Sequence, residues 1–170
     1  DRYLQQQLGK MGLSTLTQVQ RETIPLLLQG RDALVRSPTG SGKTLAYAVP
    51  LVQRLVTLGP QTVTRAAGTF ALVLVPTREL AMQIDVEAQK FGLPLGIRSV
   101  CCYGGAPKGQ QLGKMRMGCQ CVIGTPGRVN DFREGGQIQL GQVTYLVMDE
   151  ADRMLDMGFE PQIRRIVDGS

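Results

Sequence analysis

Length, composition and charge place this sequence among ordinary globular domains. Its 170 residues include 42% hydrophobic and 19% charged side chains, which suits one folded domain and excludes a disordered chain. The sequence has no histidine, so histidine acid–base catalysis and histidine metal ligation are excluded. The formal net charge of +5 suits a surface that binds a polyanion, although many basic proteins bind no nucleic acid.

The first third of the chain predicts two helices on either side of a short strand. Thr17 is a suitable N-cap and Gly30 a suitable end for the first helix, in which Pro25 predicts a kink or a later start. The run 32–36 is short, apolar and partly β-branched, which favours a buried strand. Apolar residues at helical spacing over 45–58 predict the second helix.

The rest of the chain alternates between strands and helices. The run 71–75 is apolar on both faces, which is typical of a central strand in a parallel sheet. We expect further strands at 97–102, 121–124 and 145–148, and helices at 77–91, at 109–117, from 125 and at 151–157. This alternation predicts an α/β fold, with a mostly parallel sheet covered by helices on both faces.

The four cysteines occur as the pair Cys101–Cys102 and as Cys119 and Cys121. Paired zinc ligands are usually spaced by two to four residues, and these pairs lack that spacing. Each pair lies beside β-like sequence, which predicts buried free thiols. The sequence contains no signal peptide and no apolar run of membrane-spanning length, so we expect a reducing intracellular compartment, nucleus or cytoplasm, and no membrane partner.

The stretch 37–44, which reads SPTGSGKT, stands between the predicted strand and the second helix. A loop in this setting directs backbone N–H groups at a phosphate, and Gly40 and Gly42 permit the close approach. Lys43 adds a positive charge for the β and γ phosphates, and Thr44 offers a hydroxyl to Mg²⁺. The generic pattern has glycine where this chain has Ser37. The context nevertheless predicts a nucleotide phosphate site.

A pair of carboxylates, Asp149 and Glu150, directly follows the predicted strand 145–148. An aspartate at such a strand end can hold Mg²⁺, and a neighbouring glutamate can orient and deprotonate a water molecule. Alternatively, acidic residues in this place merely cap the helix that follows. Combined with the phosphate loop, the pair favours Mg²⁺-dependent hydrolysis of a nucleoside triphosphate.

Residues 149–152 read Asp-Glu-Ala-Asp, and nearly the whole chain resembles the first RecA-like domain of a DEAD-box RNA helicase. The resemblance implies that 1–170 is the N-terminal RecA-like, ATP-binding domain, incomplete at its C-terminal end, with an adenine-recognition segment within 1–30. It implies that Gln20, not Gln18, reads adenine, and that Tyr3 stacks on the base. The segment departs from the family's usual residues at Leu13, Leu16 and Gln18.

Three further segments match those that line the family's RNA track: 76–80, 104–105 and 125–128. Helix N-termini, a glycine pair and arginines suit binding to a phosphate backbone without base reading. The RNA-contacting residues implied by the resemblance are Thr77, Arg78, Gly104, Gly105, Thr125, Gly127 and Arg128.

The resemblance also implies the roles of the remaining site residues. Asp149 and Thr44 would hold Mg²⁺, Glu150 would be the general base, and Asp152 would link nucleotide state to RNA binding. The apolar residues at 154, 155, 157 and 159 are expected in the core. The catalytic set is Lys43, Asp149 and Glu150, and the nucleotide contacts are Tyr3, Gln20, Thr39, Gly40, Ser41, Gly42, Lys43 and Thr44.

The family's Ser-Ala-Thr segment and second RecA-like domain, with its arginine fingers, are absent from this sequence. We therefore expect an RNA-dependent ATPase and helicase half, monomeric, that needs a second domain of the same protein for ATP hydrolysis and RNA remodelling. The Ser-Ala-Thr strand would lie between the strands ending at Ser37 and Asp149, so we expect an unfilled place in the sheet, or one filled from outside. The alternatives are a non-catalytic binding module and a different P-loop enzyme such as a small-molecule kinase.

Overall fold

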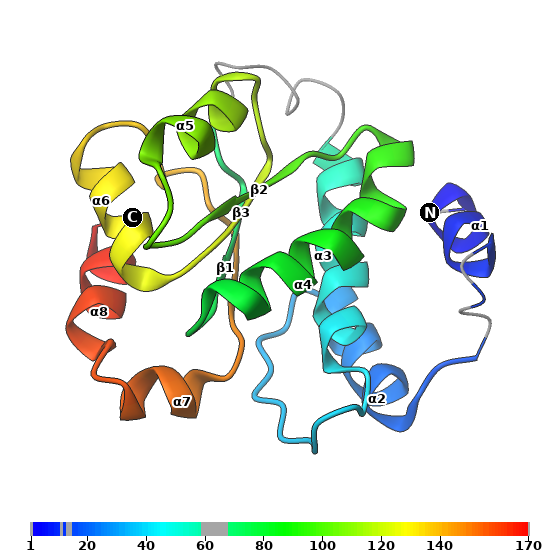
Figure 1. Cartoon of the computed structure of the whole chain (residues 1–170). Coiled ribbons are helices and arrows are strands. Elements are labelled where there is room, and N and C mark those ends of the chain that lie inside the picture. The colour runs from blue at the N-terminus through cyan, green and yellow to red at the C-terminus, as the bar shows by residue number, and fades with distance from the viewer. Residues whose placement is uncertain (1, 11, 13–14, 59–67, 170) are drawn as a thin grey trace.

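The computed structural model describes residues 2–10, 12, 15–58 and 68–169. Figure 1 shows a central sheet with helices packed on both sides. The helices are α1 Arg2–Lys10, α2 Gln18–Leu28, α3 Lys43–Leu58, α4 Arg78–Gly92, η2 Leu93–Leu95, α5 Lys108–Arg116, α6 Pro126–Glu134, α7 Ala151–Asp156 and α8 Glu160–Asp168. The strands are β1 Ala71–Leu74, β2 Ser99–Cys102, β3 Cys121–Gly124 and β4 Tyr145–Met148.

The four strands form one parallel sheet in the order β2-β3-β1-β4. The strand β1 lies in the middle and is fully buried on both faces, which confirms the central strand expected at 71–75. Because all four strands run in the same direction, the loops at their carboxyl ends meet along one edge of the sheet. That edge carries Asp149, Glu150 and the three segments predicted to bind RNA.

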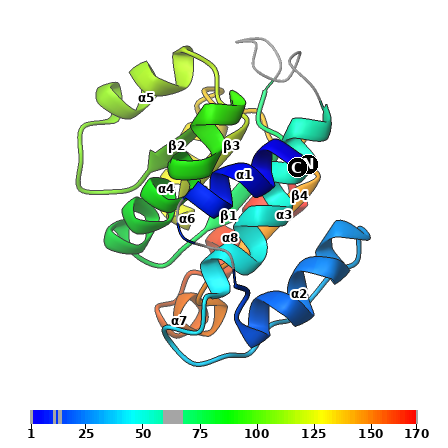
Figure 2. The ribbon, with the colours of Figure 1, turned by 90° about the vertical axis from the view of Figure 1, so that its right-hand side faces the viewer.

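Alternate residues of the strands build two separate cores. On one face, Val73 and Ile123 pack with Leu51 and Leu55 of α3 and with Ile84 of α4. On the other face, further strand residues pack with α6 and α8, which lie side by side on the left of Figure 1. Figure 2 shows α1 lying across α4, where the two helices are in contact. The two-faced covering confirms the predicted α/β architecture.

Helix starts follow the local signals closely. Thr17 is the N-cap of α2 and forms a capping box with Gln20, while Gly30 has a φ of +78° just after the helix. Thr77 caps α4, since its hydroxyl accepts a hydrogen bond from the backbone N–H of Leu80 at 3.3 Å. Pro25 is accommodated inside α2 and does not delay its start.

The predicted buried strand at 32–36 is wrong. The run is extended and unpaired, and every residue in it is exposed, with Leu34 at 84%. A strand forms only beside a partner, and β4 is the last strand of the described sheet on the side where this run would pair. Within the described residues, therefore, the strands expected to end at Ser37 and Asp149 are not directly paired.

Two predictions about buried side chains, for the cysteines and for the apolar residues at 154–159, have different outcomes. Cys102, Cys119 and Cys121 are buried and Cys101 is half-buried, all as free thiols, which confirms that prediction. The apolar group expected in the core is divided, because Met154 is buried whereas Leu155 and Met157 are about half exposed. No helix among residues 2–10, 18–58 and 78–168 is long and apolar enough to cross a bilayer.

Candidate functional site

The loop 37–42 joins the exposed run to α3 at the lower edge of Figure 1. Gly40 and Gly42 have φ angles of +79° and +89°, in the left-handed region that favours glycine. The Lys43 ammonium donates a hydrogen bond to the backbone carbonyl of Ser37. The Ser37 hydroxyl donates a hydrogen bond to the Ser41 hydroxyl. The loop thus curls around the lysine at the N-terminus of a long helix, which is the geometry of an anion site.

The start of α2 is fastened to this loop through Gln20, which is 5% exposed. Its amide oxygen accepts from the N–H of Thr17 at 3.0 Å, and its amide nitrogen donates to the carbonyl of Gly42 at 3.1 Å. A Cβ on Gly42 would lie 2.5 Å from that amide nitrogen, so a side chain at this position would displace the Gln20 amide from this contact. Gln18 instead bonds to Glu22 on the exposed side of α2. The side chain of Tyr3 lies outside the described residues.

Asp149 follows β4 and is held by a residue that the sequence analysis missed. The Tyr47 hydroxyl donates to Asp149 Oδ2 at 2.7 Å, across 102 positions of the chain. Burial, and next the charge of Asp149, raise the pKa of Tyr47 well above its usual range, so the hydroxyl stays protonated. A sequence signal existed, because Thr44 and Tyr47 are three residues apart and share one face of α3.

Glu150 has the only left-handed backbone among the described residues other than glycine, with φ 52° and ψ 47°. Its exposed carboxylate pairs with Arg153 at 3.2 Å. A strained, non-glycine residue at a ligand-facing edge is typical of functional positions. Asp152 lies exposed in the first turn of α7, directly beyond this strained residue.

The three remaining predicted segments come together at the carboxyl ends of β1, β2 and β3. The Arg78 guanidinium lies over the ring of Tyr103, 5.0 Å from its centroid. Arg128 is largely buried, with its side chain 9% exposed, and donates to the Ala106 carbonyl and to the Gln111 side chain, each at 3.2 Å. It therefore braces the loop that follows β2, a role that sequence reasoning did not assign to it.

The glycines and threonines of these segments differ in their surroundings. A Cβ added to Gly104, Gly105 or Gly127 would meet nothing within 4 Å, so the space beside their backbone is open. Thr125 precedes α6 without a side-chain capping bond, in contrast to Thr77. The open backbone beside a helix N-terminus leaves room for an anionic group.

The known proteins that this chain resembles are helicases. The family model for the DEAD/DEAH box helicase matches residues 17–169. A DEAD-box ATP-dependent RNA helicase 30 from Arabidopsis thaliana is 52% identical over 94% of this chain and 27% of its own length. An ATP-dependent RNA helicase DBP2 from Meyerozyma guilliermondii is 49% identical over 98% of this chain and 30% of its own length.

A solved structure is also similar to this chain. The crystal structure of a hypothetical ATP-dependent RNA helicase from Sulfolobus tokodaii matches with a TM-score of 0.87 and 36% identity, covering 99% of this chain and 46% of that one. The chain thus spans only about a quarter to a third of the length of the curated relatives it matches.

Proposed function

The chain belongs to the DEAD/DEAH box helicase family and has its RecA-like fold, and from this premise we propose that it is the ATP-binding half of an ATP-dependent RNA helicase. One observation above all supports the proposal. Tyr47 joins α3, the helix that begins at Lys43, to Asp149, the residue that follows β4, which supports a shared site for the phosphate loop and the acidic pair.

The nucleotide would bind with its phosphates in the loop 37–44. Lys43 would exchange the Ser37 carbonyl for the β and γ phosphates, and the N–H groups at the start of α3 would face the same charge. Residues Thr39, Gly40, Ser41 and Gly42 line this loop. Gln20 and Tyr3 would contact adenine.

The residues present suit Mg²⁺, which prefers oxygen ligands. The Asp149 carboxylate accepts a hydrogen bond from Tyr47, and the Thr44 side chain interacts with the same tyrosine, so the two oxygen donors are linked through one side chain. When bound, the ion would neutralise charge on the β and γ phosphates. Glu150 would accept the proton of the attacking water, and its exposed carboxylate is compatible with that role.

RNA would bind along the edge formed by Thr77, Arg78, Gly104, Gly105, Thr125, Gly127 and Arg128. The open glycine backbone and the start of α6 would meet phosphate oxygens, with Arg78 adding charge. Arg128 would act chiefly by bracing the loop at Ala106. None of these groups reads base edges, so the binding would be largely independent of sequence. Asp152 would couple this surface to the nucleotide.

Hydrolysis and RNA remodelling would need a second RecA-like domain of the same protein. Arginine fingers supplied across such an interface are worth about 10³ to 10⁵ in rate. The decisive experiment measures steady-state ATP hydrolysis by this chain alone and joined to a family second domain, with and without single-stranded RNA. We expect turnover only in the joined protein, raised by RNA and abolished by Lys43→Ala.

Two other outcomes would overturn the proposal. Rapid RNA-independent hydrolysis by the isolated chain would show a complete catalytic unit of another kind. No hydrolysis by a correctly folded joined protein would favour a non-catalytic binding module.

Adenine recognition has a separate test that also addresses a different P-loop enzyme. Gln20→Ala should reduce the preference for ADP over GDP, because the amide that would read the base is gone. Gln18→Ala is the matched control, since Gln18 bonds only to Glu22 on the exposed side of the same helix. Fluorescence titration with labelled ADP and GDP measures both affinities. An unchanged preference in Gln20→Ala would remove Gln20 from the adenine site.

A further inference from the structure

We propose that the Tyr47 hydroxyl is a positioning group for the Mg²⁺ site, holding the Asp149 carboxylate beside Thr44 and so strengthening Mg²⁺-dependent nucleotide binding. The inference rests on the proposed function. It assigns a role in that site to a residue outside the phosphate loop and the Asp-Glu-Ala-Asp segment.

The contacts of Tyr47 place it between the two candidate ligands. Its hydroxyl donates to Asp149 Oδ2 at 2.7 Å, and the Thr44 side chain, one turn earlier on α3, interacts with the same tyrosine. A donor fixed on Oδ2 sets the plane of the carboxylate and leaves the other oxygen as the one that a cation would take. Groups that hold metal ligands from behind in this way orient the ligand without touching the ion.

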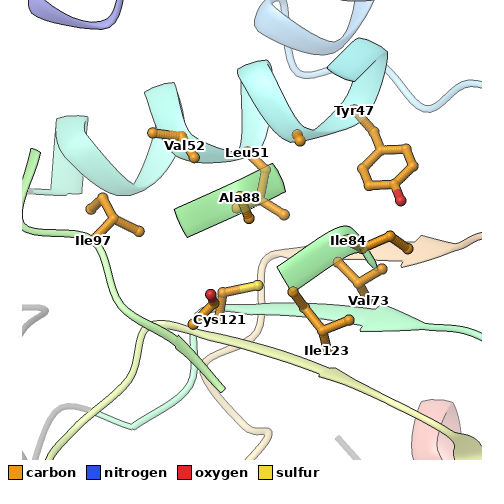
Figure 3. Close-up of a pocket in the computed structure, with 11 residues that line it drawn as sticks. Tyr47, Leu51, Val52, Val73, Ile84, Ala88, Ile97, Cys121 and Ile123 are labelled. Atoms are coloured by element: carbon orange, nitrogen blue, oxygen red, sulfur yellow. The ribbon is translucent and has the colours of Figure 1, made fainter. Parts of the chain in front are cut away.

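The ring is itself held in place. It lies at one end of the apolar contact between α3 and the sheet, beside a cavity of about 10 Å³ lined also by Leu51, Val73 and Ile84 (Figure 3). The backbone carbonyl of Tyr47 accepts a hydrogen bond from the Tyr145 hydroxyl of β4 at 3.0 Å. The helix that carries Thr44 and the strand that leads to Asp149 are thus joined by two tyrosine hydroxyls.

These two hydroxyls offer a matched pair of variants. Tyr47→Phe removes the bond to Asp149 and leaves the ring in the core. Tyr145→Phe removes a hydroxyl from the same contact between α3 and β4 but touches neither candidate ligand. Any loss common to both variants reports on the packing of α3 against β4, whereas a loss confined to Tyr47→Phe reports on the position of Asp149.

The test measures ADP binding to the 170-residue chain by calorimetry, with Mg²⁺ and with a chelator. The readout is the factor by which Mg²⁺ strengthens ADP binding, which a general loss of stability would not change. For Tyr47→Phe we expect this factor to fall about 10-fold, the usual effect of removing a group that orients a metal ligand. Binding with the chelator should stay as in the unsubstituted chain, and Tyr145→Phe should keep the full Mg²⁺ effect.

Each other outcome counts against the inference. An unchanged Mg²⁺ factor in Tyr47→Phe would show that the hydroxyl does not position Asp149. A larger factor would show that the hydroxyl competes with the ion for the carboxylate. An unsubstituted chain that binds ADP equally with and without Mg²⁺ would overturn the metal site of the proposed function itself, which is a distinct result.

Discussion

At Glu150 the backbone conformation and the chemistry make opposite demands on the residue. A left-handed φ of 52° costs a residue with a Cβ about 1–2 kcal/mol, and asparagine tolerates this region better. Glu150→Asn should therefore raise the free energy of unfolding by about 1 kcal/mol. It should also remove the proposed general base and so lower ATP turnover of the joined protein by about 10²-fold or more.

Urea unfolding and steady-state hydrolysis measure the two effects of Glu150→Asn. Glu160→Asn is the control for stability, because Glu160 also forms an exposed ion pair, with Arg164 at 2.8 Å, but begins α8 with ordinary backbone. It should not stabilise the chain. Equal changes in the free energy of unfolding of the two variants would show that the left-handed backbone at Glu150 does not destabilise the chain.

Gly42 and Gly40 share a left-handed φ but differ in what surrounds them. A Cβ on Gly42 would meet Gln20 at 2.5 Å and Thr17 at 3.1 Å, whereas one on Gly40 would meet nothing within 4 Å. Gly40→Ala should cost about 1 kcal/mol of backbone strain. Gly42→Ala should cost about 2–3 kcal/mol, since it adds a collision with the buried start of α2. Urea unfolding compares them, and equal losses would show that α2 is not fastened to the loop.

Among the elements, the capped helix starts and the four paired strands could be predicted from the sequence, whereas the fate of one apolar run and one helix could not. Caps at Thr17 and Thr77 set the starts of α2 and α4 within one residue. The run 32–36 has strand-like composition, but pairing depends on a neighbour that composition does not reveal. The helix α8 was missed although Pro161 near its start and Gly169 after its end are its ordinary signals.

The strands β2 and β3 bring the cysteines together in the interior, which makes the fold sensitive to alkali. Burial raises the pKa of Cys119 from 9.0 to about 11. The folded state therefore keeps a proton that the unfolded state loses, so this stability is present below about pH 9 and lost as pH rises toward 11. The loss for this thiol approaches about 1.4 kcal/mol per pH unit.

Urea unfolding from pH 8 to 11 tests this dependence. Cys119→Ala should unfold more easily at neutral pH but show a shallower decline with pH, because one of the titrating thiols is gone. Parallel pH profiles for the two proteins would show that Cys119 titrates alike in the folded and unfolded states.

For the whole molecule, the order of motifs along the chain was enough to predict which segments meet at the sheet edge. Parallel strands bring their carboxyl ends together, so Asp149 and the segments that follow β1, β2 and β3 had to share an edge once the fold was known. The loop at Ser37 instead follows an unpaired run, and it is linked to Asp149 through Tyr47 of α3. Spacing on α3 marks Tyr47 as a neighbour of Thr44, but its pairing with Asp149 could not be predicted, because the two residues are 102 positions apart.

The open side of β4 yields the last prediction. Among the described residues β4 has no neighbour strand on the side away from β1. Leu146 and Met148 of β4 are 42% and 46% exposed, and Leu34 of the unpaired run is 84% exposed. We propose that a strand from outside this sequence, the family's Ser-Ala-Thr segment, lies between β4 and the run 32–36.

Leu34→Asp should change the unfolding free energy of the 170-residue chain by less than about 0.5 kcal/mol. In a chain extended through that segment, it should cost about 2 kcal/mol or more, because the strand would bury Leu34. Leu28→Asp on α2, at a residue also exposed, should cost the same in both chains. Equal effects of Leu34→Asp in the short and extended chains would mean that the run 32–36 stays outside the sheet.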